Sequence, residues 1–140
     1  MATILLVNPA LAYSGWNADL GKPSPDGSFI RLGIAYLAGA LKARGHVVKL
    51  ADLRMLLGWE EYEKLLERIR PDFVGVSIHS VEWSFAVEAA RRAKKVVPRV
   101  KTIAGGVHPT MFPDECAAQD AFDYVLKGEG EVSLPLLVED

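Results

Sequence analysis

Several residues that could hold a ligand follow apolar segments of this 140-residue sequence. They are Asn8 and Pro9, then Ser77, Ile78 and His79, then Gly105, Gly106, His108 and Pro109, and finally Gly128 and Glu129. These groups combine hydroxyl, amide, imidazole and carboxylate side chains with backbone that carries no side chain. Because no nucleophile elbow and no Cys–His pair accompanies them, the set predicts ligand binding and no catalytic residue.

The glycine pair Gly105-Gly106 is the most informative of these groups. Two residues without Cβ let a bulky flat ligand approach the backbone, or permit positive φ angles. A tight turn from a strand into a helix would use the same dipeptide, so both interpretations stay open. The Ser77 hydroxyl can donate and accept hydrogen bonds, which suits a ligand rich in amides or phosphate, although a strand end can use such a residue structurally.

Missing motifs exclude several familiar chemistries. The first apolar segment is followed neither by a Walker loop nor by G-x-G-x-x-G, so nucleotide sites of those types are not expected. A phosphoacceptor receiver domain needs an acidic pair and an aspartate where this chain has Asn8-Pro9 and Ser77. The single cysteine, Cys116, rules out an internal disulfide and a multi-cysteine metal or iron–sulfur site within this sequence. We interpret Cys116 as a packing residue.

The composition predicts an ordinary globular domain, with 50% hydrophobic and 24% charged residues. Domains commonly contain about 100 to 150 residues, so residues 1–140 are expected to form one domain. The net charge of -2 gives no reason to expect a nucleic-acid partner. The apolar start, residues 4–7, is too short to span a membrane, and the low cysteine content makes a cytoplasmic location the default expectation.

The elements that must position the candidate residues alternate between strand and helix along the whole chain. Five short apolar or β-branched runs predict strands at 3–8, 47–52, 72–78, 100–104 and 123–126. This alternation predicts an α/β fold of the flavodoxin-like (Rossmann-like) type, a three-layer αβα sandwich around a five-stranded parallel sheet of order 2-1-3-4-5. All the candidate groups then lie at the carboxyl edge of the sheet, where open α/β sheets bind ligands.

Helical periodicity fills the segments between the strands. Apolar stripes predict helices around residues 30–41, 59–69 and 85–97, a short helix from Pro113, and a last helix from about Gly130, whose course Pro135 disturbs. His46 falls at the opposite end of the second strand and is expected to be structural. The segment from Pro9 to Phe29 has no clear period, and a loop of that length at the end of the first strand is expected to be functional or disordered.

Five stretches in order and spacing resemble the N-terminal cobalamin-binding domain of cobalamin-dependent radical SAM enzymes. The matching stretches are residues 5–9, 31–38, 70–77, 104–110 and 123–131. The resemblance implies a corrinoid lying across the carboxyl edge of the sheet, with its nucleotide tail inserted beside the strands. Ser77 matches the family's Ser-x-Leu position, although Ile78 and His79 follow it here. Gly105-Gly106 matches the glycine pair that lets the tail pass.

Two departures from the related families shape the expected chemistry. The methionine synthase type supplies a cobalt ligand from Asp-x-His-x-x-Gly after the first strand, and no histidine occurs here before His46. His79 and His108 have no partners at metal-ligand spacing, so we predict base-off cobalamin without a protein histidine on cobalt, and no separate metal site.

The second departure is the missing Cys-x-x-x-Cys-x-x-Cys motif of the radical SAM domain. S-adenosylmethionine and an iron–sulfur cluster are therefore expected only in a C-terminal radical SAM domain or partner chain, and this segment alone is expected to catalyse nothing. The leading hypothesis is a cobalamin-carrying module for methyl transfer or radical chemistry. The alternatives are a cofactor-free interaction module of the same fold and a flavin- or nucleotide-binding domain of flavodoxin type.

Overall fold

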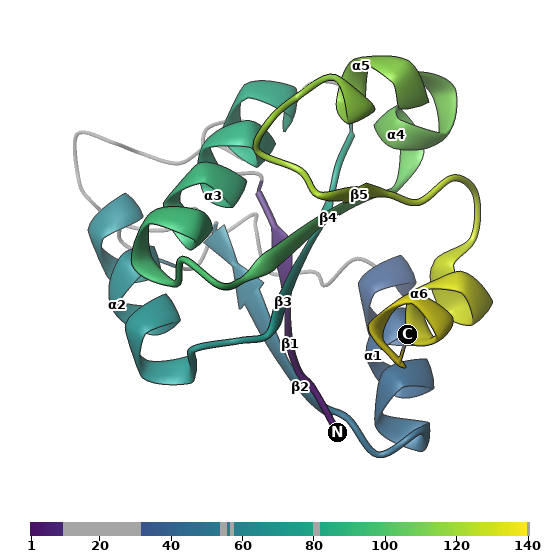
Figure 1. The fold of residues 1–140 in the computed structure, drawn as a ribbon, viewed down its shortest axis with the longest axis horizontal. Coiled ribbons are helices and arrows are strands. Elements are labelled where there is room, and N and C mark those ends of the chain that lie inside the picture. The colour runs from purple at the N-terminus through teal and green to yellow at the C-terminus, as the bar shows by residue number, and fades with distance from the viewer. Residues whose placement is uncertain (10–31, 54–55, 57, 80–81, 140) are drawn as a thin grey trace.

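A computed structural model describes residues 1–9, 32–53, 56, 58–79 and 82–139 of the chain. Within these residues five strands form one parallel sheet of order β2-β1-β3-β4-β5 (Figure 1). The strands are β1 (Thr3–Asn8), β2 (Val47–Asp52), β3 (Phe73–Ser77), β4 (Lys101–Gly105) and β5 (Tyr124–Val125). The predicted fold class and strand order are confirmed: the chain has a flavodoxin-like fold.

Helices cover both faces of the sheet. They are α1 (Leu32–Ala43), α2 (Trp59–Ile69), α3 (Trp83–Val96), α4 (Val107–Met111), α5 (Pro113–Ala117) and α6 (Gly130–Glu139). Figure 1 shows α2 and α3 on one side of the sheet, and α1 and α6 side by side on the other. The described helices agree with the predicted ones, except that the sequence did not predict the short α4. Residues 10–29 of the predicted loop and the first predicted helical residue, Ile30, lie outside the described residues.

The inner strand β1 is apolar on both of its faces. Its residues alternate between the two hydrophobic cores, with Leu5 and Val7 facing α2 and α3, and Ile4 and Leu6 facing α1 and α6. All four are at most 3% exposed. A strand covered on both faces in this way has no solvent side, so its sequence reads as one continuous apolar run.

β1 and β2 have the predicted bounds, whereas β3, β4 and β5 differ from the predicted strands by one residue at each end. Asp72 was predicted in β3, but its carboxylate instead accepts a hydrogen bond from the Thr3 N–H at 2.8 Å. Asp123 was predicted in β5, but its carboxylate accepts the Thr102 N–H at 2.8 Å. In both places an aspartate side chain takes a backbone hydrogen bond at the start of a strand.

The amino edge of the sheet is held by His46, as its predicted structural role requires. Its Nδ1 accepts the Ala2 N–H at 3.1 Å, and its Nε2 lies 3.2 Å from a Glu139 carboxylate oxygen. Arg44 also binds Glu139, at 2.7 Å. These contacts join β1, β2 and the end of α6. In the described parts of the chain, no helix is both long and apolar enough to cross a membrane.

Candidate functional site

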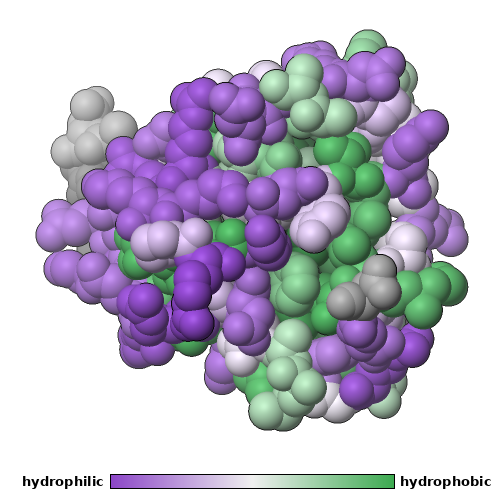
Figure 2. Space-filling model, viewed as in Figure 1, coloured by the Kyte–Doolittle hydropathy of each residue, from purple (hydrophilic) through white to green (hydrophobic). Residues whose placement is uncertain are grey.

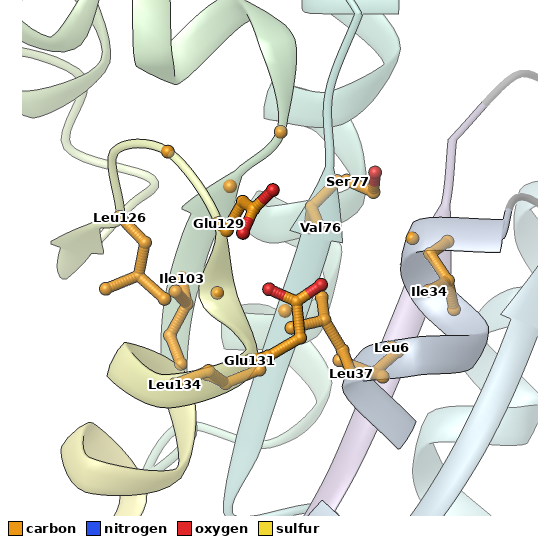
Figure 3. Close-up of a pocket in the computed structure, with 16 residues that line it drawn as sticks. Leu6, Ile34, Leu37, Val76, Ser77, Ile103, Leu126, Glu129, Glu131 and Leu134 are labelled. Carbon is orange, nitrogen blue, oxygen red and sulfur yellow. The ribbon is translucent and has the colours of Figure 1, made fainter. Parts of the chain in front are cut away.

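A cavity of about 220 Å³ opens at the carboxyl edge of the sheet, between the sheet and the helices α1 and α6 (Figure 3). It is lined by residues of β1, β3 and β4, of both helices, and of the loops that follow β4 and β5. These are Leu6, Gly33, Ile34, Leu37, Gly75, Val76, Ser77, Ile103, Gly105, Gly106, Leu126, Gly128, Glu129, Gly130, Glu131 and Leu134.

Small residues on the sheet create this cavity. Leu6, Gly75 and Ile103 are paired in register on the neighbouring strands β1, β3 and β4. The middle residue of this row is a glycine and has no side chain. Two residues further along, Ser77 pairs with Gly105. Because side chains alternate between faces along a strand, Gly75, Ser77, Ile103 and Gly105 all face α1 and α6. Because two of these residues are glycines and one is a serine, few side-chain atoms fill the space between the sheet and the two helices.

Gly105 faces open space. A Cβ placed there meets no described heavy atom within 4 Å, and the residue does not have a positive φ angle. A side chain at this position would project into the cavity without disturbing the backbone. The glycine keeps the cavity open, which agrees with the close-approach interpretation of the glycine pair.

Gly106 has the other role that the sequence left open, that of a turn residue. Its φ angle is +107°, and a Cβ there would lie 2.9 Å from the backbone nitrogen of Ile78. The backbone around it is hydrogen bonded across the strand ends: Ile78 N–H donates to Gly105 O at 2.8 Å and His108 N–H donates to Ile78 O at 3.0 Å. Gly106 thus lets the β4–α4 turn press against the end of β3.

A second glycine turn forms the far wall of the cavity. Gly128 has a φ angle of +73°, and its N–H donates to the Thr110 hydroxyl at 2.8 Å. The same hydroxyl donates to Gly106 O at 2.8 Å. Thr110 therefore ties the loop after β5 to the turn after β4, so the two glycine-containing walls are held together.

Polar groups gather at one end of the cavity. Figure 3 shows Ser77 and Glu129 at that end, whereas Leu6 and Leu134 lie at the other; the Glu131 carboxylate points toward the polar end. Among the described lining residues there is no lysine, arginine or histidine. The mouth therefore offers hydrogen-bond acceptors and negative charge, which disfavours an anionic group beside it.

The structure brings together five of the predicted site residues. Ser77, Gly105, Gly106, Gly128 and Glu129 all line the cavity, although they come from three separate segments of the chain. They meet because parallel strands end at the same edge of the sheet. Their assignment to a cofactor stays a prediction.

Both predicted histidines lie away from the cavity wall. His108 is 5% exposed and its ring lies between those of Trp83 and Phe112, with centroid distances of 4.8 Å and 5.2 Å. Its Nε2 is 3.7 Å from a Glu115 carboxylate oxygen. His79 is exposed at the edge, and its backbone N–H donates to the Glu82 carboxylate at 3.2 Å.

The remaining predicted residues do not line the cavity either. Ile78 is fully buried in the opposite core, which faces α2 and α3. Asn8 is 4% exposed, with its Nδ2 3.5 Å from an Asp52 carboxylate oxygen. Pro9 and Pro109 are also buried. These residues therefore belong to the edge of the sheet but not to the cavity wall.

Sequence reasoning missed much of the cavity wall. Gly75 and the aliphatic residues of α1 and α6 were interpreted as ordinary strand and core residues. Gly75 carries the clearest overlooked signal, because a glycine between two buried valines in a strand marks a close approach by something else. The helix residues carry no such signal, since an apolar stripe has the same appearance whether it packs on a sheet or borders a cavity.

Cys116 lies in α5 with its side chain buried in the core, which agrees with its predicted packing role. Burial and the neighbouring Glu115 carboxylate raise the pKa of its thiol to about 11, so the reactive thiolate is scarce near neutral pH. In the part of the chain that the structure describes, no three His, Cys, Asp or Glu side chains are grouped to hold a metal ion.

Asp123 anchors the start of β5, the strand that precedes Gly128 and Glu129. Its carboxylate accepts hydrogen bonds from the Thr102 N–H at 2.8 Å and the Lys94 ammonium at 2.6 Å. Burial alone would raise the pKa of Asp123, but the hydrogen bonds from Lys94 and Thr102 outweigh it and lower the pKa below its usual value. The carboxylate is thus favoured in the folded state.

We expect Asp123→Asn to lower the free energy of unfolding at pH 7 by about 1 kcal/mol, since it removes a charged acceptor at a partly exposed site. A depressed folded-state pKa contributes stability above the unfolded-state pKa of about 4, and that contribution is lost as pH falls through the folded-state pKa. Urea titrations at pH 7 and pH 3 should therefore show the difference shrinking at pH 3. Asp120→Asn, at an exposed aspartate nearby, is the matched control. Equal losses at both pH values would contradict the assignment.

Comparisons with known proteins place this architecture in context. Residues 24–138 match the B12 binding domain family. The chain is 34% identical over 113 residues to an uncharacterized methyltransferase of Pyrococcus horikoshii, covering 77% of this chain and 24% of that protein. It is 30% identical over 155 aligned positions to the cytidylyl-2-hydroxyethylphosphonate methyltransferase of Streptomyces wedmorensis, covering 97% of this chain and 28% of that protein.

A solved structure shares the fold over nearly the full length. The cobalamin-dependent S-adenosylmethionine radical enzyme OxsB, with aqua-cobalamin and S-adenosylmethionine bound, superposes with a TM-score of 0.76 at 20% identity. The match covers 99% of this chain and 18% of that one. This chain therefore spans well under a third of the length of each of these relatives.

Proposed function

Because the chain belongs to the B12 binding domain family, we propose that it binds cobalamin across the carboxyl edge of its sheet, with the nucleotide tail in the cavity between the sheet, α1 and α6. The observation that carries this assignment is the open space above Gly105, in register with Ser77 and beside Gly75. A cavity kept open by glycines on an otherwise close-packed sheet is suited to a flat group entering from the edge.

The size of the cavity fits the tail and not the whole cofactor. An apolar cavity of about 150 Å³ can hold benzene, so about 220 Å³ has room for a bicyclic ring. Sites that enclose a whole drug-sized ligand usually measure about 300 to 1,000 Å³. The corrin ring would therefore lie outside the cavity, over the strand ends, where the exposed His79 is available as a neighbour.

We propose that the bound form is base-off, because a lower base held in the cavity cannot also coordinate cobalt. Of the two histidines at this edge, His108 is enclosed by Trp83 and Phe112, which leaves His79 as the exposed imidazole. No histidine follows β1 in the described residues before His46, at the far edge. When bound, cobalamin supplies a cobalt centre for methyl transfer or radical chemistry. The work of this chain is to hold and orient it.

The partner of this module is proposed to be a radical SAM domain, in the same protein or in a partner chain, that carries S-adenosylmethionine and an iron–sulfur cluster. The methyltransferase relatives and the length difference support this. Apolar surface over α6, β5 and α4 also supports it (Figure 2). Met111, Tyr124, Val132 and Leu136 are 39% to 71% exposed there, and such patches mark interaction sites. A cytoplasmic location, expected from the single cysteine, stays a prediction.

The flavin alternative is disfavoured by the charge of the cavity mouth. A flavin mononucleotide brings a phosphate monoester with about two negative charges, and flavodoxin-type sites must surround it with donors. Here Glu129 and Glu131 stand at the mouth, and no cationic side chain lines the described wall. The nucleotide tail of cobalamin also carries a phosphate, but as a diester with a single negative charge, so the carboxylates oppose it less than they oppose the phosphate monoester of a flavin.

The direct test is retention of the cofactor. The purified protein is mixed with hydroxocobalamin, free cofactor is removed by gel filtration, and the visible spectrum is recorded, with flavin mononucleotide as the parallel probe. We expect about one equivalent of cobalamin and no flavin to be retained. Loss of all cobalamin on the column would overturn the proposal and favour the cofactor-free interaction module.

The ligation state is tested separately by electron paramagnetic resonance of the reduced cob(II)alamin complex. We expect no nitrogen superhyperfine splitting, since neither the lower base nor an imidazole would be on cobalt. Splitting that disappears in His79→Ala would show that His79 binds cobalt, and splitting that persists in this variant would show that the lower base stays on cobalt. Either result would contradict the base-off assignment.

A further inference from the structure

The inner end of the cavity is aliphatic. Its side chains come from β1, β4, the loop after β5, and both covering helices: Leu6, Ile34, Leu37, Ile103, Leu126 and Leu134. Figure 3 shows Leu6, Leu37 and Leu134 together at the end away from Ser77 and Glu129. Leu6, Ile34, Ile103 and Leu134 are each at most 5% exposed. A group that enters past the mouth therefore meets hydrocarbon.

Two backbone donors at the strand ends beside the cavity are already used. Ile78 N–H donates to Gly105 O and Leu126 N–H to Ala104 O, both at 2.8 Å, as the sheet pairing requires. The polar side chains of the described wall, Ser77, Glu129 and Glu131, belong to or point toward the mouth. A polar edge of a ligand at the inner end would lose its water and gain no side-chain partner from the described wall, which is unfavourable.

From this separation we infer that the cavity selects cobamides by their lower base, and prefers an apolar base to a purine. The inference rests on the proposed function, because the tail must occupy the cavity. Dimethylbenzimidazole and cresol present methyl groups and ring carbons to the aliphatic end. Adenine presents an exocyclic amine and ring nitrogens, which need donors and acceptors that the inner wall lacks. Discrimination then arises from unpaired polar groups on the wrong ligand, the kind of difference that binding sites enforce well.

The measurement is a set of dissociation constants by absorbance titration of the whole chain with three probes: cobalamin, cresolylcobamide and adeninylcobamide. We expect the first two to agree within about threefold and adeninylcobamide to bind roughly 10- to 100-fold more weakly. Equal binding of all three would overturn the inference while leaving the proposed function intact. Failure to bind any of the three would overturn both.

A matched pair of variants assigns the effect to the aliphatic end. Leu37→Gln places an amide in the cavity wall and is expected to reduce the preference for cobalamin over adeninylcobamide to less than about fivefold. Leu50→Gln makes the same change at an exposed position on β2, outside the cavity, and should leave the wild-type preference unchanged. An unchanged preference in Leu37→Gln, with binding retained, would show that the inner wall does not discriminate between lower bases.

Discussion

Gly105→Leu is expected to weaken cobalamin binding by about 100-fold while shifting Tm by no more than a few degrees. The backbone accepts the change, because Gly105 lies in a strand without a positive φ angle and a Cβ there meets no heavy atom of the described chain within 4 Å. The added side chain instead occupies the space that the tail needs. Spectrophotometric titration with hydroxocobalamin measures the loss of affinity, and thermal unfolding of the free protein measures the fold.

The control for this variant is Gly39→Leu. Gly39 lies in α1, is exposed, does not line the cavity, and likewise has open space around its Cβ position within the described structure. It should bind cobalamin as the wild type does. A Gly105→Leu protein that binds cobalamin with unchanged affinity would place the tail elsewhere and remove the main support for the proposed site.

Gly106→Ala is expected to lower the free energy of unfolding by about 3 kcal/mol. The new Cβ would lie 2.9 Å from Ile78 N and 3.1 Å from Ile78 O, which are backbone atoms that cannot rotate away. The φ angle of +107° is also strained for any L-residue with a side chain. Relief requires the β4–α4 turn to move off β3, and the hydrogen bond from His108 N–H to Ile78 O would be weakened with it. Urea unfolding measures the change.

Gly39→Ala is the matched control for this second variant, with the opposite sign. In the interior of a helix, alanine is favoured over glycine by about 0.5 to 1 kcal/mol, so this protein should become slightly more stable. A Gly106→Ala protein within about 0.5 kcal/mol of the wild type would show that the turn relaxes easily, and that Gly106 has no structural requirement.

The two glycines of the dipeptide are thus expected to affect two different properties, the affinity for the cofactor and the stability of the fold. Changing Gly105 alters the affinity for the cofactor with the fold intact, whereas changing Gly106 alters the stability of the free protein. If both variants lost stability, or both lost only binding, the division of roles between cavity and turn would be wrong. The sequence alone could not assign these roles, because it offered close approach and tight turn as alternatives for the pair as a whole.

The order of the strands, and with it the edge where the site lies, was determined by the sequence. Alternating strand and helix patterns make the sheet parallel, and short right-handed crossovers then leave few possible orders. Once Asn8, Ser77 and Gly105 each end a strand of such a sheet, they must lie at one edge. The match of residues 24–138 to the B12 binding domains confirms the family resemblance, while the assignment of these residues to the cofactor stays a prediction.

Tertiary structure alone decided which edge residues face the cavity. Ser77 and Ile78 are neighbours in the chain, yet Ser77 lines the cavity while Ile78 is buried in the opposite core, because a pleated strand sends successive side chains to opposite faces. The His108 ring likewise packs against Trp83 and does not line the cavity. The cavity itself requires Leu37 of α1 and Glu131 of α6 to meet, nearly a hundred positions apart in the chain. Such a meeting depends on how two helices pack on one sheet, and local sequence patterns carry no record of it.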